Sequence, residues 1–248
     1  MPTLEWIGKS KVINHHQEVP FRVLERKYSF DENGEHSEDN GSDNMIIRGD
    51  NLEALKALLP RYEGRVKCIY IDPPYNTGNE GWVYNDNVND PKIKKWLGEV
   101  VGKEGEDLTR HDKWLCMMYP RLKLLQKLLA DDGVIFISID DREQVLLRMI
   151  CNEIFGENNF LAQFVWQKRT SPDMRKLVST AHEYVCAYCK DISYLPNAIS
   201  KVALSEEDAE NYKNPDNDPR GPWASSDFTA QGFRPNEMYD CLLYTSPS

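Results

Sequence analysis

Three short apolar segments, each followed by a segment with helical periodicity, restrict the fold of this 248-residue chain most strongly. VKCIYI (66–71) and VIFISI (134–139) are nearly continuous apolar runs, which are typical of strands buried in a parallel sheet. MIIRGD (45–50) is a shorter run that we interpret as a further strand. Since parallel strands need crossover connections, the pattern predicts an α/β fold with an open, mostly parallel sheet and helices on both faces.

The predicted helices alternate with these runs. Leucines and other apolar residues recur at helical spacing in 51–60, 111–133 and 143–156. Pro120 predicts a kink in the second of these helices, and Gly133 predicts its end. In an open α/β sheet, ligands bind at the carboxyl ends of the strands, so we expect the functional residues directly after each apolar run.

Composition divides the chain into four parts. Residues 1–44 form an N-terminal extension that ends in an acidic linker, because 29–44 hold six acids and no Lys or Arg. Residues 45–165 form the α/β body. Residues 166–240 are interpreted as the start of a second module, and 241–248 as a tail foreign to the native protein.

Charge and apolar content exclude some classes of protein. No apolar run approaches the roughly 18 residues of a membrane span, and the N-terminus lacks a signal peptide, so we expect a soluble, cytoplasmic protein without a membrane partner. The net charge of −10 speaks against nucleic acid as a partner. However, 31–43 and 206–218 each hold six acids, and the remainder has 29 basic against 28 acidic residues. The body of the protein is therefore close to neutral.

The six cysteines are scattered through apolar segments, which is typical of reduced thiols. Cys186 and Cys189 form a C-x-x-C pair. No second Cys or His pair stands at zinc spacing, so we expect no metal site.

The most specific motif is D-P-P-Y, which begins at Asp72 directly after the run 66–71. Asp72 and the carbonyl group of Pro73 can accept hydrogen bonds from both protons of an exocyclic amine on a base. The diproline limits the freedom of that carbonyl, and Tyr75 offers a ring on which a base can stack. A rigid turn without a catalytic role is the alternative.

The chain resembles the amino-methylating DNA methyltransferases of the permuted β group, in particular the N-terminal part of the modification subunit of type III restriction-modification systems. The resemblance implies a Rossmann-like fold that depends on S-adenosylmethionine and is incomplete here. It implies that 45–165 form a catalytic half-domain and that 166–240 begin a target-recognition module. The matching segments are IRGDNLEAL (47–55), IYIDPPYNTGN (69–79), DGVIFISIDD (132–141), EIFGENNF (153–160), HEYVCAYCK (182–190) and GPWASSDFTAQGFRPNEMY (221–239).

The resemblance also implies an activity, which is methyl transfer from S-adenosylmethionine to N6 of an adenine flipped out of duplex DNA. It assigns a catalytic role to Asp72, Pro73, Pro74 and Tyr75, and Asp rather than Ser at position 72 favours adenine over cytosine. Asp50 and Asp72 would contact the cofactor. For Asp50, capping of the following helix is an equally good interpretation.

Further residues have alternative roles. Asn76, Trp82 and Tyr84 are candidates for the wall of the base pocket, although packing explains Trp82 and Tyr84 as well. Asp140 and Asp141 follow the third strand, where we favour capping of the next helix. Candidate phosphate contacts, or else a solvated basic face, are Lys92, Lys94, Lys95, Lys168, Arg169, Arg175 and Lys176.

The sequence departs from the family in one respect, since the glycine-rich motif F-x-G-x-G is missing. We therefore expect the chain to end before the module that carries it. Two alternatives to an active adenine methyltransferase stay open: a fragment that cannot bind the cofactor alone, and a methyltransferase for cytosine N4 or another amine. The implied partners are double-stranded DNA, a second copy in a homodimer of the full-length protein, and a restriction subunit with helicase and nuclease activity.

Overall fold

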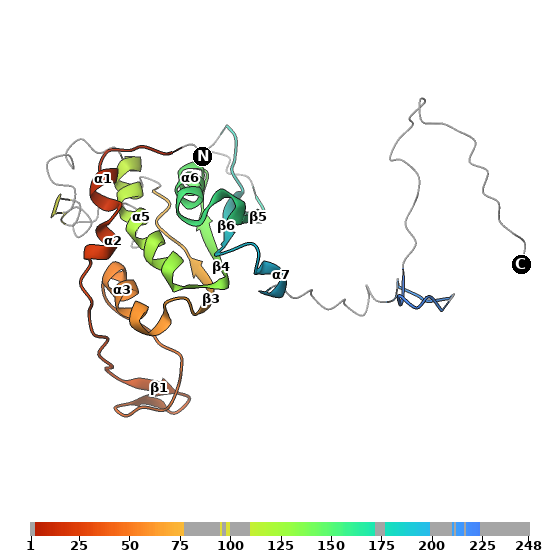
Figure 1. Ribbon diagram of the computed structural model, residues 1–248, viewed down its shortest axis with the longest axis horizontal. Helices are drawn as coiled ribbons and strands as arrows, with labels where there is room; N and C mark the ends of the chain where they lie inside the picture. Colours follow the sequence, from red (N-terminus) through yellow and green to blue (C-terminus); the bar gives the residue numbers. More distant parts are fainter. Residues whose placement is uncertain are drawn as a thin grey trace, which may run out of the picture. The chain divides into compact units, whose positions relative to one another are not determined.

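The computed structural model describes residues 3–76, 95, 98–99, 110–171, 177–198, 210, 212–215 and 217–223. The chain divides into two compact units, Met1–Ile199 and Ser200–Ser248. In the second unit, Lys213 and Trp223 form an antiparallel bridge. The first unit contains, in chain order, α1 (Lys9–Val12), α2 (His15–Glu18), β1 (Ser29–Asp31), β2 (Gly34–His36), α3 (Asn51–Tyr62), β3 (Val66–Ile71), α5 (Arg110–Leu128), β4 (Leu129–Ile139), α6 (Gln144–Phe155), a short 3-10 helix η2 (Glu157–Asn159), β5 (Phe160–Gln167), β6 (His182–Cys189) and α7 (Leu195–Ala198) (Figure 1).

The first unit is built on a four-stranded sheet with the order β3-β4-β6-β5. Strands β3 and β4 are parallel, and the Tyr70–Phe136 pair lies in their ladder. Strand β6 is antiparallel to both β4 and β5. The α/β class is confirmed, with one parallel and two antiparallel pairings in this sheet. Because β6 runs in the opposite direction, its N-terminal end lies at the edge where β3 and β4 end.

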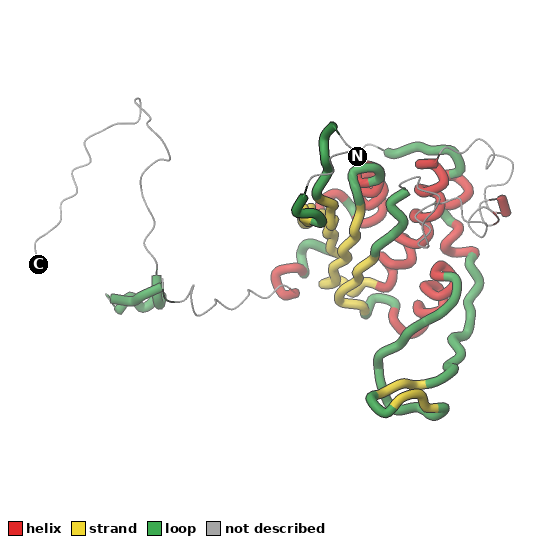
Figure 2. Tube along the Cα trace, turned by 180° about the vertical axis from the view of Figure 1, so that it is seen from behind, coloured by secondary structure: helices red, strands yellow, loops and turns green. Residues whose placement is uncertain are grey.

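The helices pack on one face of this sheet. Figure 1 shows α5 and α6 in front of the strands, whereas the view from behind shows the strands in front of the helices (Figure 2). Ile135, Ile137 and Ile139 point to the helical side and are fully buried. On the other face, the side chains of Tyr70 and Phe164 are 63% and 52% exposed. The expected second helical layer is therefore not formed by the described residues.

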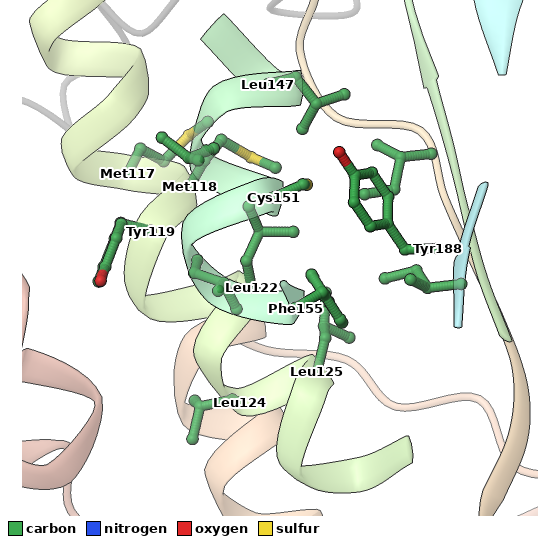
Figure 3. Packing of buried hydrophobic residues seen from close by; sticks show 14 of the residues in the cluster. Met117, Met118, Tyr119, Leu122, Leu124, Leu125, Leu147, Cys151, Phe155 and Tyr188 are labelled. Atoms are coloured by element: carbon green, nitrogen blue, oxygen red, sulfur yellow. The ribbon is translucent and has the colours of Figure 1, made fainter. Parts of the chain in front are cut away.

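The apolar core lies between α5, α6 and the sheet (Figure 3). Helix α5 contributes two neighbouring methionines, Met117 and Met118, and α6 contributes Leu147 and Cys151. Tyr188 reaches this core from β6, and its hydroxyl group donates to Asn152 Oδ1 over 2.7 Å. Burial of this layer against the sheet is the main source of stability of the unit.

The N-terminal residues differ from the expected extension. Val12 in α1 is fully buried, and Val19, just after α2, is 5% exposed. Lys9 donates to Glu153 Oε2 over 3.0 Å, and Lys56 donates to the carbonyl oxygen of His16 over 3.0 Å. The segment before the acidic linker is thus part of the core of the first unit.

The acidic linker also contains regular structure, because β1 and β2 form an antiparallel hairpin within it. Gly34 adopts a φ of 111°, and the Asn33 amide donates to Asp31 Oδ1 over 2.8 Å. The residues Asp-Glu-Asn-Gly favour a tight turn, and this turn explains the hairpin. The prediction of a flexible linker, which rests on composition alone, is wrong for these residues.

Two further expectations from the sequence are corrected. The run 45–50 is not a strand: Ile46 is 96% exposed, and β3 pairs only with β4 among the described residues. Gly133 does not end a helix, because α5 continues through Pro120 to Leu128 and Gly133 lies within β4. A Cβ atom at Gly133 would lie 2.7 Å from the carbonyl oxygen of Val66, so the close approach of β3 explains the glycine.

The boundary expected at 166 falls inside the first unit. Strand β6, which we assigned to the second module, pairs with β4 along the residues from Val134 to Ile139. The strand ladder that joins β4, β6 and β5 is a long-range pairing that the apolar pattern does not encode. None of the helices among the described residues is long and apolar enough to cross a bilayer.

Candidate active site

The turn formed by residues 72–76, called the DPPYN turn below, follows β3 directly. Asp72 is exposed at its start, and residues 73–75 are partly buried. Asn76 ends the turn with a φ of 56°, in the left-handed region that asparagine tolerates better than most residues. Two consecutive prolines fix φ between Asp72 and Tyr75, so the backbone of the turn is rigid.

Tyr75 lies half-buried next to the exposed carboxylate of Asp72. Burial raises the pKa of the Tyr75 phenol well above its usual value, and a hydrogen bond to Asp72 raises it further. A hydrogen bond with Ser138, at the end of β4, has the opposite effect on this pKa. Lys168 Nζ lies 5.9 Å from the centre of the Tyr75 ring. The motif therefore presents a carboxylate and an aromatic ring side by side.

The backbone of the turn is held by helix α5. The indole Nε1 of Trp114 donates to the carbonyl oxygen of Pro74 over 2.6 Å, and the Trp114 side chain is fully buried. Among the described residues, this hydrogen bond goes to Pro74 and none goes to the carbonyl group of Pro73. The Pro73 carbonyl is the one that the sequence assigns to an amine proton.

The last residue of the turn is held by a buried polar cluster, called the Glu143 cluster below, which consists of Asn76, His111 and Glu143. Asn76 and Glu143 are both 0% exposed. Asn76 Nδ2 donates to Glu143 Oε1 and, over 3.2 Å, to the carbonyl oxygen of Arg110. His111 Nδ1 donates to the same Glu143 Oε1 over 2.7 Å.

The electrostatics of the Glu143 cluster follow from its burial. Loss of hydration raises the pKa of the Glu143 carboxyl group above its ordinary value. Hydrogen bonds from Asn76 and His111, and the positive charge of Arg110, oppose this increase in the pKa. Among the described residues, no donor reaches two buried acceptor atoms of the cluster, Glu143 Oε2 and Asn76 Oδ1.

The N-terminal end of β6 brings further polar groups to the same sheet edge. Glu183 Oε2 accepts from Lys168 Nζ over 3.2 Å. His182 Nε2 lies 3.0 Å from the hydroxyl group of Tyr184 and 3.8 Å from Asp141 Oδ1. A hydrogen bond to Asp141 raises the pKa of the Tyr184 phenol. The sheet edge therefore combines acidic, basic and aromatic groups around the DPPYN turn.

The structure shows which of two acidic residues, Asp50 and Asp140, caps the helix that follows it, and the cofactor role of Asp50 stays a prediction. Asp50 caps α3, since its Oδ1 accepts from the amides of Leu52 and Glu53 over 2.9 and 3.2 Å. Asp140 does not cap α6: its Oδ1 accepts from the Arg142 amide over 3.0 Å, and its Oδ2 pairs with the Arg142 guanidinium group at 2.8 Å.

The candidate base-pocket residues have separate outcomes. Asn76 is buried in the Glu143 cluster. Trp82 and Tyr84 lie outside the described residues.

Sequence reasoning missed Glu143 and His111, because a glutamate at a helix start and a histidine before an apolar stripe are common on solvated surfaces. Of the basic candidates, Lys95, Lys168 and Arg169 are described and Lys92, Lys94, Arg175 and Lys176 are not.

Comparison with known proteins gives the class of this chain. The DNA methylase family matches residues 66–240, which is more than half of the sequence. The chain therefore belongs to the DNA methylase family, and the resemblance seen in its sequence is confirmed.

Three individual relatives show which DNA methylases this chain is similar to. The chain is 36% identical over 231 residues to the Mod subunit of the type III restriction-modification enzyme EcoP15I of Escherichia coli, which covers 85% of this chain and 35% of that protein. It is 38% identical over 203 residues to the EcoPI Mod subunit of Escherichia phage P1, and the match covers 76% of this chain and 30% of that protein. The type II methyltransferase M.KpnI of Klebsiella pneumoniae is 33% identical over 165 residues, and the match covers 66% of this chain and 36% of that protein. The chain thus spans about a third of the length of these relatives.

Proposed function

We propose that this chain carries the residues that bind the target amine in a DNA methyltransferase, which methylates N6 of adenine within a restriction-modification system. The observation that carries the proposal is the exposed carboxylate of Asp72 beside the ring of Tyr75 on a rigid turn at the end of β3. The identity of the chain to type III Mod subunits supports the choice of DNA as substrate.

The chemistry follows from the weakness of the nucleophile. The lone pair of an adenine amine is delocalised into the ring, so the nitrogen attacks poorly. Asp72 and the Pro73 carbonyl oxygen can each accept one amine proton, which directs the lone pair outward, while Tyr75 stacks on the base. S-adenosylmethionine, when bound, would supply the methyl group and leave as the neutral thioether, and Asp72 would be the acceptor for the proton that the amine loses. The base must first leave the duplex to reach this edge.

We assign S-adenosylmethionine as the cofactor, which supplies a methyl group on a positively charged sulfur when bound. The residues present fit such a group, because Asp72 and Asp50 both offer exposed carboxylates to its hydroxyl and amine donors. Asp50 Oδ1 already accepts two helix amides, which leaves its second oxygen atom for the cofactor.

The proposed partners come from the relatives and from the family resemblance. They are double-stranded DNA, a restriction subunit, and a second copy of the protein in a homodimer. We expect the protein to act in the cytoplasm, where a restriction-modification system binds its DNA.

Mass spectrometry of nucleosides tests the reaction. DNA is incubated with S-adenosylmethionine and the complete gene product that contains these 248 residues. We expect N6-methyladenine to accumulate. Detection of N4-methylcytosine alone would contradict the adenine assignment, and unmethylated DNA would contradict the proposed function.

Calorimetry with the 248-residue chain separates a cofactor-binding unit from an inactive fragment. Micromolar binding of S-adenosylmethionine supports a site that forms within this segment. Absence of heat, with the complete gene product binding normally, shows that the site needs residues outside it.

A further inference from the structure

The Glu143 cluster connects the DPPYN turn to two helices at the point where the turn ends. Glu143 directly precedes α6, His111 lies in the first turn of α5, and Asn76 is the last residue of the turn. Glu143 Oε1 accepts hydrogen bonds from both other members of the cluster. A single carboxylate oxygen therefore joins three segments that are distant in the sequence.

The Glu143 cluster stabilises the fold less than apolar side chains of the same shape would. Glu143 and Asn76 are completely buried, and each has one acceptor atom that no donor of the described residues reaches. A buried charge and two buried unpaired acceptors all destabilise a fold relative to apolar side chains of the same shape. Buried polar groups of this kind are found where geometry matters more than stability.

The Glu143 cluster is connected to the candidate reacting groups, Asp72 and Tyr75, through a short and rigid segment of backbone. Asn76 adjoins Tyr75, and the diproline between Tyr75 and Asp72 leaves little freedom to absorb a displacement. Trp114 fixes the carbonyl group of Pro74 from α5. Without the hydrogen bonds of Asn76, the last residue of the turn would lose the side-chain contacts that connect it to α5 and to the start of α6.

We propose that Glu143 is a positioning residue, which holds the DPPYN turn through Asn76, with His111 holding Glu143 in its orientation. This inference rests on the proposed function, because the groups that are positioned are Asp72 and Tyr75. Glu143 itself does not touch the base.

Exchange of the donor and acceptor tests the proposal. Glu143→Gln removes the charge, and Asn76→Asp places a second carboxylate against Glu143. The double variant Asn76→Asp with Glu143→Gln reverses the hydrogen bond, so that the amide of residue 143 donates to the carboxylate of residue 76, and it conserves the total charge. Glu157→Gln is the matched control, because it makes the same change on an exposed side chain.

The first readout is methyl transfer by the complete gene product, measured per folded molecule. We expect each single variant to lower kcat about 100-fold with little change in KM, since small displacements of reacting groups have effects of this size. The Glu157→Gln control should lie within about twofold of the unaltered protein, and the double variant should be faster than either single variant without full recovery, because residue 76 no longer donates to the Arg110 carbonyl oxygen. Unchanged kcat in Glu143→Gln, or a double variant as slow as the single ones, would overturn the proposal.

The second readout needs no activity, so it separates failure of this inference from failure of the proposed function. Hydrogen exchange at the amides of Tyr75 and Asn76 is measured in the 248-residue chain. We expect faster exchange in Glu143→Gln and recovery in the double variant. If the unaltered protein methylates no DNA but this exchange pattern holds, the proposed function fails and the positioning contact stands. If exchange is the same in all variants, the positioning contact is refuted.

Discussion

The indole N–H of Trp114 donates to the carbonyl oxygen of Pro74 over 2.6 Å, from the buried side of α5 to the middle of the DPPYN turn. Trp114 is fully buried and Pro74 is partly buried, so the donor comes from the interior of the first unit. Proline residues donate no backbone hydrogen bonds, and the turn therefore depends on donors from neighbouring elements. Helix α5 supplies that donor in addition to its role in the core.

Replacement of Trp114 tests this support. Trp114→Phe keeps an aromatic ring in the core but removes the donor to the Pro74 carbonyl oxygen. We expect the free energy of unfolding to fall by about 0.5–1.5 kcal/mol, the net contribution of one hydrogen bond, because the partly buried Pro74 can be hydrated instead. Urea unfolding followed by circular dichroism measures the change. A variant as stable as the unaltered chain would show that the hydrogen bond contributes nothing.

The exposed carboxylate of Asp72 gives the second prediction. Asp72→Ala should reduce methyl transfer by the complete gene product about 100-fold or more, because removal of one preorganised polar group from a reacting centre has this effect. The side chain is exposed, so we expect the free energy of unfolding to change by less than about 0.5 kcal/mol. Radiolabelled methyl incorporation and urea unfolding measure the two quantities.

Asp43→Ala serves as the control for Asp72→Ala, since Asp43 is an exposed acid in the linker. It should leave both quantities unchanged. Normal methyl transfer in Asp72→Ala would remove this residue from the candidate site.

The sequence predicted the elements that local patterns define. The run 66–71 forms β3 and the leucine pattern after Asp50 forms α3, because strand burial and helix periodicity are short-range properties. The position of Asp72 at the end of β3 follows directly from the first of these. The D-P-P-Y motif and its place at the end of a strand are therefore predictable from local sequence alone.

The surroundings of that turn depend on contacts between distant segments. Pairing of β6 with β4 brings His182 and Glu183 to the same edge as Asp72, and no apolar period encodes this pairing. Glu143 follows Asp-Asp-Arg, where a solvated side chain is the usual expectation. Its burial results from α5 and the turn closing over it, which is a tertiary effect.

The burial of Glu143 predicts a dependence of stability on pH. Burial raises the pKa of this carboxyl group in the folded state above its ordinary value of 4.5. The folded protein therefore binds the proton more tightly than the unfolded chain, and the resulting stabilisation is complete below pH 4.5 and is lost as the pH rises through the folded-state pKa. His111 and Arg110 are the charged neighbours that limit this shift.

Glu143→Gln should remove this contribution, so the free energy of unfolding of the variant should fall less steeply with pH above 4.5 than that of the unaltered chain. Urea unfolding at a series of pH values gives both curves. Glu157→Gln, an exposed counterpart, should retain the slope of the unaltered chain. Parallel curves for the unaltered chain and Glu143→Gln would contradict the raised pKa.

The two roles of Asp50 can be separated by two substitutions. Asp50→Ala removes the cap of α3 and should lower the free energy of unfolding by about 1 kcal/mol, whereas Asp50→Asn keeps an acceptor oxygen and should leave it nearly unchanged. Calorimetry with S-adenosylmethionine on the complete gene product then tests the carboxylate. We expect Asp50→Asn to weaken binding about tenfold, because hydrogen bonds to a charged acceptor are stronger than those to a neutral one. Equal affinity in Asp50→Asn and the unaltered protein would mean that Asp50 acts only as the helix cap.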